Sequence, residues 1–206
     1  MTAPDPRPLL ARAMDQAADL VSGTRVEELG LPTPCEGWDV RTLCSHIVGV
    51  HHRIAHIARG ALPSDISSMP EVADGRHTAE LAAARADVDR AWGLDGGDDG
   101  DVLDREVVVP WGTMPARFAG FGYVQELTVH AWDLAAATDR VEGLDEGLAV
   151  AVEETAHRVL PAEPRGGPIP FGPPVPAGDD ARPYARLVAW LGRNPTFSTN
   201  GMAAGR

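Results

Sequence analysis

The sequence has little of what marks membrane, secreted and nucleic-acid-binding proteins. No apolar run approaches the roughly 20 residues that a helix needs to span a bilayer, so we expect no membrane partner. The only cysteines, Cys35 and Cys44, are too few for a disulfide framework, and we expect both to be free thiols. The formal net charge of −12 argues against a nucleic-acid partner, because phosphate binding needs a basic face.

Lysine is absent altogether, so every strongly basic side chain is arginine. Together with the abundance of Ala, Gly and Pro, this absence reflects a coding bias and carries no argument about function. The first residues also lack a basic patch followed by an apolar core. We therefore expect no signal peptide and a cytoplasmic location.

Length and composition indicate one globular domain. The 206 residues suffice for one well-packed domain and are few for two, and the apolar fraction of 44% is ordinary. We expect a single domain over residues 1–206, with its core over about 7–160 and a Pro/Gly-rich tail over 161–206. No internal repeat is present.

Apolar side chains recur at helical spacing in several segments. This periodicity predicts helices over residues 8–21, 40–61, 79–92, 115–138, 146–160 and 182–191. β-branched residues followed by a glycine predict a hairpin or extended segment over 105–114. The acidic run 96–101 is typical of a flexible connection, and residues 200–206 of a frayed end. Four main helices with one small extended element indicate an all-α bundle.

Glu126 and His130 lie four residues apart in a long predicted helix. On a helix, positions i and i+4 share one face, so both side chains can reach one point in space. A carboxylate and a neutral imidazole held this way make half of a divalent-metal site. Such a pair is common by chance, but the apolar and aromatic surroundings of this one indicate partial burial. Buried polar side chains need partners, and a metal ion is a strong one.

A third ligand is expected from the predicted helix over 40–61, which offers His46, His51, His52 and His56. At about 100° per residue, His46 falls on the apolar stripe, which makes it the better inward-facing candidate. His52 and His56 form an i,i+4 pair that could bind metal by itself, although a solvated face is the simpler interpretation. Arg53 lies two turns after His46 and could bind an anionic substrate group beside the metal.

Two further residues have alternative interpretations. Asp133, three residues after His130, could be a fourth ligand or an acceptor that orients an imidazole N–H. A structural cap or ion-pair partner is an equally good interpretation of Asp133. Cys35 precedes a predicted helix start, where a thiol pKa can fall, but the sequence shows no separate base for a nucleophile there.

Two sets of motifs together resemble a known family. The first comprises Pro32–Cys35, Gly37–Arg41, Leu43 and His46, and the second Gln125–Glu126 with Val129–Ala135. They resemble the DinB/YfiT-like superfamily, and most closely the branch of the mycothiol-dependent maleylpyruvate isomerase N-terminal domain. The stretches Phe171–Pro176 and Leu187–Pro195 resemble single-domain actinobacterial metal-binding members of that branch. The resemblance covers nearly the whole chain.

The resemblance implies a four-helix bundle with a small hairpin element and a short C-terminal tail helix. It also implies a divalent ion, zinc or alternatively nickel, whose ligands by position are His46, Glu126 and His130. Three protein ligands leave an open coordination position, as in catalytic sites. Members of the superfamily often pair, which suggests a homodimer. The isomerase carries an additional domain after the bundle where this chain has a short tail, so isomerase activity itself does not follow from the resemblance.

Three functions are open on these grounds. The first is a metal-dependent enzyme that binds a low-molecular-weight thiol of the mycothiol type as thiolate, for S-transfer to a small electrophile or its isomerisation. The second is a hydrolase that uses metal-bound water, for which the sequence shows no general base. The third is a non-catalytic metal- or small-molecule-binding module, which a fourth ligand from Asp133 or His52 would favour. In a purely structural alternative, His46, Glu126 and His130 satisfy one another in the core.

Overall fold

The computed structural model describes residues 4–96, 102–166 and 171–199, and within them the chain is mainly helical. The α-helices are α1 (Arg7–Gly23), α2 (Val40–Ala58), α3 (His77–Trp92), α4 (Ala116–Ala137), α5 (Glu146–Val159) and α6 (Pro183–Trp190). An antiparallel hairpin of β1 (Glu106–Val109) and β2 (Gly112–Pro115) precedes α4. Short 3-10 turns lie at Val26–Glu28, Pro63–Asp65, Val102–Asp104 and Val141–Gly143.

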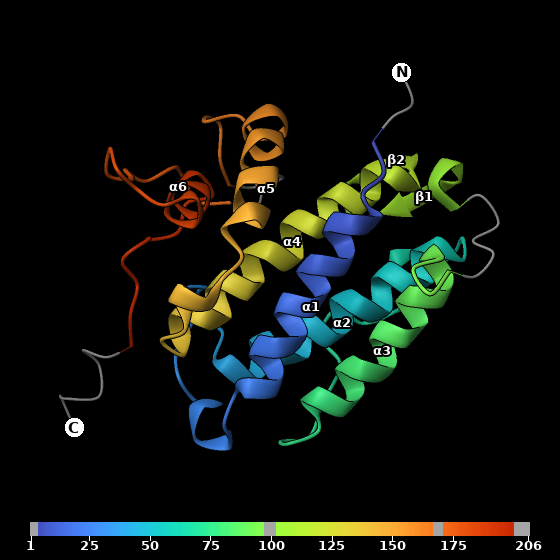
Figure 1. Ribbon diagram of the computed structural model, residues 1–206, viewed down its shortest axis with the longest axis horizontal. Coiled ribbons are helices and arrows are strands. Elements are labelled where there is room, and N and C mark those ends of the chain that lie inside the picture. Colours follow the sequence, from blue (N-terminus) through green and yellow to red (C-terminus); the bar gives the residue numbers. More distant parts are fainter. Residues whose placement is uncertain (1–3, 97–101, 167–170, 200–206) are drawn as a thin grey trace.

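The helices form the expected all-α bundle with a small hairpin and a C-terminal helix (Figure 1). α2 packs against α3 and α4, and α1 packs against the same two helices. α5 and α6 pack on each other, on the side of α4 that faces away from α3 (Figure 1). In the described ranges, none of the helices is both long and apolar enough to cross a bilayer.

The predicted helix boundaries agree with the structure to within a few residues. The largest difference is at the end of α2, which stops at Ala58 because Gly60 adopts a φ of 82° and turns the chain. The start of α2 follows local chemistry, since the Asp39 carboxylate accepts a hydrogen bond from the Thr42 N–H at 2.8 Å. The predicted connection at 96–101 and the predicted frayed end at 200–206 lie outside the described residues, apart from Gly96.

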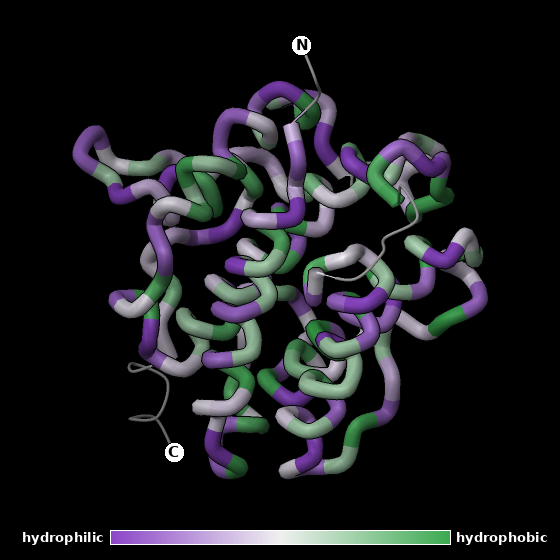
Figure 2. The backbone as a smooth tube through the Cα atoms, turned by 45° about the vertical axis from the view of Figure 1, so that its right-hand side comes forward, coloured by the Kyte–Doolittle hydropathy of each residue, from purple (hydrophilic) through white to green (hydrophobic). Residues whose placement is uncertain are grey.

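α4 occupies the centre of the molecule and is apolar on more than one face. It contacts α1 and α2 on one side and α5 on the other, which explains why its buried residues do not form a single stripe. Hydrophobic and hydrophilic residues alternate along much of the tube in Figure 2, as expected for elements with one solvated face. The predicted ligands of α4, Glu126 and His130, are partly buried, with side chains 20% and 15% exposed.

The hairpin packs on the first turns of α4. Val107 and Val109 are buried on its inner face, whereas Trp111, in the turn, packs edge-on against Tyr123 with ring centroids 5.1 Å apart. Gly122 makes this contact possible, because a Cβ there would lie 2.5 Å from the Trp111 ring. The hairpin thus covers the end of α4 that precedes the predicted ligands.

Candidate metal centre

The structure brings His46 of α2 together with Glu126 and His130 of α4. One potential ligand atom from each of the three side chains lies within 4.8 Å of the other two. The Nε2 atom of His46 is 3.4 Å from Oε1 of Glu126, and the centroids of the two imidazoles are 4.8 Å apart. The helical spacing predicted this cluster, and metal binding by it stays a prediction.

His46 is oriented by the main chain of the loop before α3. Its Nδ1 atom lies 3.1 Å from the Ser68 carbonyl oxygen, and because a carbonyl can only accept, Nδ1 carries the hydrogen. Gly49 lets this loop approach α2, since a Cβ at Gly49 would lie 2.5 Å from the same carbonyl oxygen. The unprotonated Nε2 of a neutral His46 is left facing Glu126.

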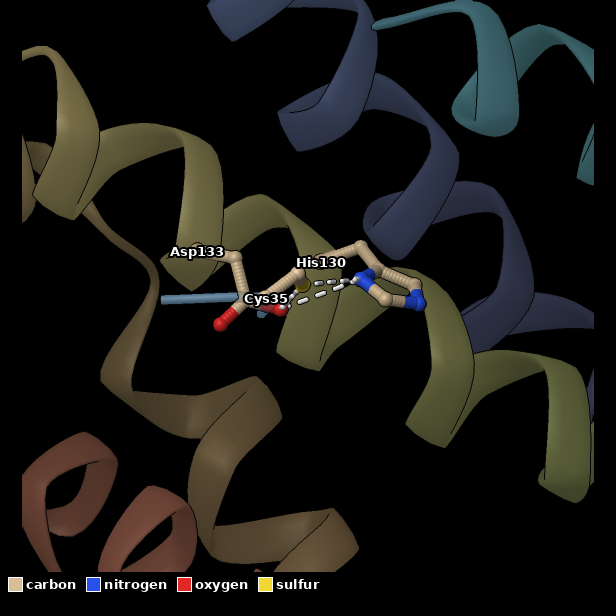
Figure 3. A group of neighbouring side chains, drawn as sticks. All are labelled: Cys35, His130 and Asp133. Atoms are coloured by element: carbon tan, nitrogen blue, oxygen red, sulfur yellow. Dashed lines mark hydrogen bonds and ion pairs between the residues drawn. The ribbon is translucent and has the colours of Figure 1, made fainter. Parts of the chain in front are cut away.

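His130 is oriented in the same sense, but by a side chain. Its Nδ1 atom points toward Oδ2 of Asp133 (Figure 3), and the two atoms are 3.0 Å apart, so the hydrogen again sits on Nδ1. Asp133 is fully buried, and its carboxylate also accepts hydrogen bonds from Arg193 at 2.7 and 2.9 Å. Burial raises the pKa of Asp133, but the Arg193 charge and the hydrogen bonds from His130 and Arg193 outweigh it and lower that pKa to about 2.

Glu126 supplies the negative charge of the cluster. Burial raises its pKa, but when the two imidazoles are protonated, a hydrogen bond from His46 and the charges of His130, His46 and Arg53 outweigh this effect and lower the pKa overall. With the hydrogen of His46 on Nδ1, Nε2 and the Glu126 carboxylate would face each other as two acceptors. Two acceptors at 3.4 Å are favourable only when a cation lies between them, either a second proton on His46 or a metal ion. The donor set therefore fits a divalent ion.

Cys35, His130 and Asp133 form a second group of potential ligand atoms, which suits a cation less well. Both Asp133 oxygens are already bound by the guanidinium of Arg193, which a metal ion would have to displace. Burial raises the pKa of the Cys35 thiol to about 12, and the thiol donates to Asp133 at 3.2 Å. The geometry favours Asp133 as the acceptor that orients His130, and it does not favour Cys35 as a nucleophile.

The side chains of Arg53 and Tyr123, which interact electrostatically with Glu126, carry buried polar atoms that have no hydrogen-bond partner among the described residues. Arg53 is only 9% exposed and its Nε atom has no partner, and the hydroxyl of the completely buried Tyr123 has none either. Burial and then the Glu126 charge raise the pKa of Tyr123, and the Arg53 charge lowers those of Tyr123 and Glu126. The two unpartnered groups therefore share the electrostatic surroundings of Glu126.

The remaining histidines of α2 do not join either group of potential ligands in the part of the chain that the structure describes. His51 is buried and its Nδ1 atom lies 2.8 Å from the Ile47 carbonyl oxygen, while burial lowers its pKa to about 4. His52 and His56 are partly exposed. Cys35 and Cys44 are both free thiols, as predicted.

Sequence reasoning missed four contributors to this site. Trp38 places its ring 4.9 Å from that of His46 and 6.0 Å from that of His130. The Ser68 carbonyl, the Cys35 thiol and Arg193 reach the site from segments far apart in the chain. One signal was available, because a glycine inside a helix, such as Gly49, often marks a close approach of another backbone.

Comparison with known proteins places the bundle in a family. Residues 10–135 match the family model described as the mycothiol maleylpyruvate isomerase N-terminal domain. Two relatives from Mycobacterium tuberculosis are each 33% identical over 189 residues, which cover 90% of this chain and 97% of theirs. They are Uncharacterized protein MT0763 (strain CDC 1551 / Oshkosh) and Uncharacterized protein Rv0738 (strain ATCC 25618 / H37Rv).

Two solved structures are also similar to this chain. The crystal structure of the mycothiol-dependent maleylpyruvate isomerase matches with a TM-score of 0.45 and 20% identity, and that of a mutant of this enzyme with 0.45 and 21%. The matched region covers 63% of this chain and 59% of the isomerase chain. This chain therefore matches less than two thirds of that enzyme's length.

Proposed function

The chain belongs to the family of the mycothiol maleylpyruvate isomerase N-terminal domain, and from this membership we propose that it is a metal-dependent enzyme that uses a low-molecular-weight thiol. The observation that carries the proposal is the convergence of His46, Glu126 and His130, with the free ring nitrogens left by two separate orienting hydrogen bonds. These three residues would hold a divalent ion, with zinc expected and nickel as the alternative.

The bound ion would lower the pKa of a thiol of the mycothiol type, so that the thiolate exists near neutral pH. The protein's own part is to keep the two imidazoles in one tautomer and in one orientation. Ser68 and Asp133 accept the Nδ1 hydrogens, and Trp38 packs against both rings and restricts their rotation. Three protein ligands leave room for the thiol, which we propose serves S-transfer to a small electrophile or its isomerisation.

Arg53 supports an anionic substrate. Burying a guanidinium without hydrogen bonds is costly, so such a group is typical of a site whose partner is a ligand. Arg53 is buried near Glu126 without a hydrogen bond to the described residues, and the unpartnered Tyr123 hydroxyl shares its surroundings. We propose that Arg53 anchors a carboxylate of the substrate, a group whose two oxygens match the guanidinium fork.

Elemental analysis and thiol titration of one metal-loaded sample test the proposal. We expect one zinc ion per chain, and after replacement by cobalt a change in the visible spectrum when 2-mercaptoethanol is added. Thioglycolate, which adds a carboxylate to the thiol, should bind about tenfold more tightly, and Arg53→Met should remove this preference. His46→Ala and His130→Ala serve as controls that lose the metal.

The outcomes separate the alternatives. Wild-type protein without metal would support the purely structural arrangement, in which the three residues satisfy one another. Metal without thiol binding would exclude the thiol mechanism and leave a hydrolase or a binding module, which a panel of esters would distinguish. Hydrolysis has less support because Asp133, the remaining carboxylate beside the cluster, already accepts hydrogen bonds on both oxygens. The same hydrogen bonds disfavour Asp133 as a fourth ligand.

A further inference from the structure

In the segment after α6, the side chain of Arg193 contacts the candidate metal centre. The Nε atom of Arg193 donates to Oδ1 of Asp133 at 2.7 Å, and Nη2 donates to Oδ2 at 2.9 Å. Two parallel bonds from a planar guanidinium fix both the position and the plane of a carboxylate. Asp133 is completely buried and the Arg193 side chain is only 15% exposed, so water competes little for these bonds.

The backbone at the end of α6 aims Arg193 in this direction. The N–H of Gly192 bonds to the carbonyl of Ala189, and the N–H of Arg193 bonds to that of Val188, the pair of bonds that defines a Schellman cap. Gly192 has a φ of 80°, and a Cβ there would lie 2.6 Å from the Gly172 carbonyl oxygen. Glycine is therefore required by both backbone conformation and space, and the turn it makes brings Arg193 to the bundle.

The Asp133 carboxylate, which Arg193 holds in place, in turn bonds to a predicted metal ligand. Its Oδ2 atom, held by Arg193, also accepts from His130 Nδ1 and from the Cys35 thiol (Figure 3). We infer that Arg193 is a positioning residue of the metal centre. It acts through Asp133, which accepts the Nδ1 hydrogen of His130 and so leaves Nε2 of that ring free for the ion. Without Arg193 the carboxylate could rotate, and His130 would lose the acceptor that fixes its tautomer.

This role concerns a part of the chain outside the family match. The match ends at residue 135, so it contains the three predicted ligands and Asp133 but not Arg193. The bundle supplies the ligand set, and the C-terminal segment supplies the group that fixes one ligand. The inference rests on the proposed function, since it assumes that His46, Glu126 and His130 bind an ion.

Arg193→Met, compared with a matched control, tests the inference. Arg186 of α6 forms a similar two-bond pair with Glu153 of α5, at 2.9 and 2.8 Å, without contacting the centre, so Arg186→Met is the control. We expect Arg193→Met to weaken zinc binding by about 10- to 100-fold in a competition with a chromophoric chelator. Arg186→Met should leave zinc affinity within about twofold of wild type. Arg193→Lys keeps the charge but loses the fork, and should be intermediate.

Nitrogen-15 NMR of the metal-free protein adds a readout that a merely structural role would not move. His130 should be the Nδ1–H tautomer in wild type and in Arg186→Met, and a mixture of tautomers in Arg193→Met. Wild-type zinc affinity in a folded Arg193→Met protein would overturn the inference alone. If that variant does not fold, wild-type affinity in Arg193→Lys would overturn it equally. A wild-type protein that binds no zinc would instead overturn the proposed function, and this inference with it.

Discussion

Two sides of the candidate metal centre differ in how their buried polar atoms are paired. Behind His130, the Asp133 carboxylate accepts hydrogen bonds from His130, Cys35 and Arg193. Near Glu126, by contrast, the buried Nε atom of Arg53 and the buried hydroxyl of Tyr123 have no hydrogen-bond partner among the residues that the structure describes. Both sides belong to one bundle and are similarly removed from water, so burial alone does not account for the difference.

The difference indicates that the two sides of the centre have different roles. A buried polar network in which each member has a partner is rigid and specifies one arrangement, as a metal ligand requires. A buried polar group without a partner costs stability, and sites of this kind are typical of places where a ligand completes the hydrogen bonds. Under the proposed function, the Asp133 side would hold the ligands in place, and the Arg53 side would bind an anionic group.

The strongest test of this comparison is the stability of two arginine-to-methionine variants without ligand. Arg193→Met should lower the free energy of unfolding by about 3–5 kcal/mol, because it leaves the Asp133 carboxylate buried without its cation. Arg53→Met should change it by no more than about 1 kcal/mol, because the Arg53 side chain makes no hydrogen bond to a described residue that would be left buried without its partner. Denaturant unfolding in the presence of a chelator measures both. Changes of the same sign and size would mean that the two sides do not differ.

Removal of a predicted ligand should have the next largest effect. His130→Ala and His46→Ala should each weaken zinc binding by more than the roughly 100-fold that loss of an outer hydrogen bond costs. His52→Ala is the matched control, because His52 lies on α2 like His46 but outside the ligand groups of the described residues. Its zinc affinity should equal that of wild type in a chelator competition. Equal losses in all three variants would contradict the proposed ligand set.

The buried His51, which belongs to neither group of potential ligands among the described residues, gives a pH-dependent test. Its folded-state pKa of about 4 lies below the ordinary value of 6.5, because burial disfavours the charged ring. The contribution of neutral His51 to the free energy of unfolding is complete above pH 6.5 and is lost as the pH falls from 6.5 towards 4. The loss amounts to on the order of 3 kcal/mol. In metal-free protein, the free energy of unfolding should fall with decreasing pH across this range, and His51→Phe should reduce the slope. An unchanged slope in this variant would contradict the assignment of the pH dependence to His51.

The smallest expected effect comes from the glycine that admits the loop beside His46. In Gly49→Ala the new Cβ would meet the Ser68 carbonyl at 2.5 Å, so the loop must move and His46 loses its acceptor. We expect a loss of about 1–3 kcal/mol in unfolding free energy and roughly tenfold weaker zinc binding. Gly143→Ala, where a Cβ meets nothing within 4 Å, is the control and should change neither quantity.

The sequence alone determined the helices and the shared face of Glu126 and His130, because both depend on short-range periodicity. The i,i+4 spacing of Glu126 and His130, and the place of His46 on the apolar stripe of α2, follow from 3.6 residues per turn. The Asp39 cap that starts α2 is equally local. Family resemblance then connected the two helices, which spacing within one helix cannot do.

Only the tertiary structure decided what holds those ligands in place. Ser68, Cys35 and Arg193 come from a loop, a turn and the C-terminal segment, which have no periodicity that could predict where their polar groups point. Their positions depend on long-range packing, including the close approaches at Gly49 and Gly192. The same packing left Arg53 buried and unpartnered, because a side chain's hydrogen-bond partners are set by the elements that fold against it.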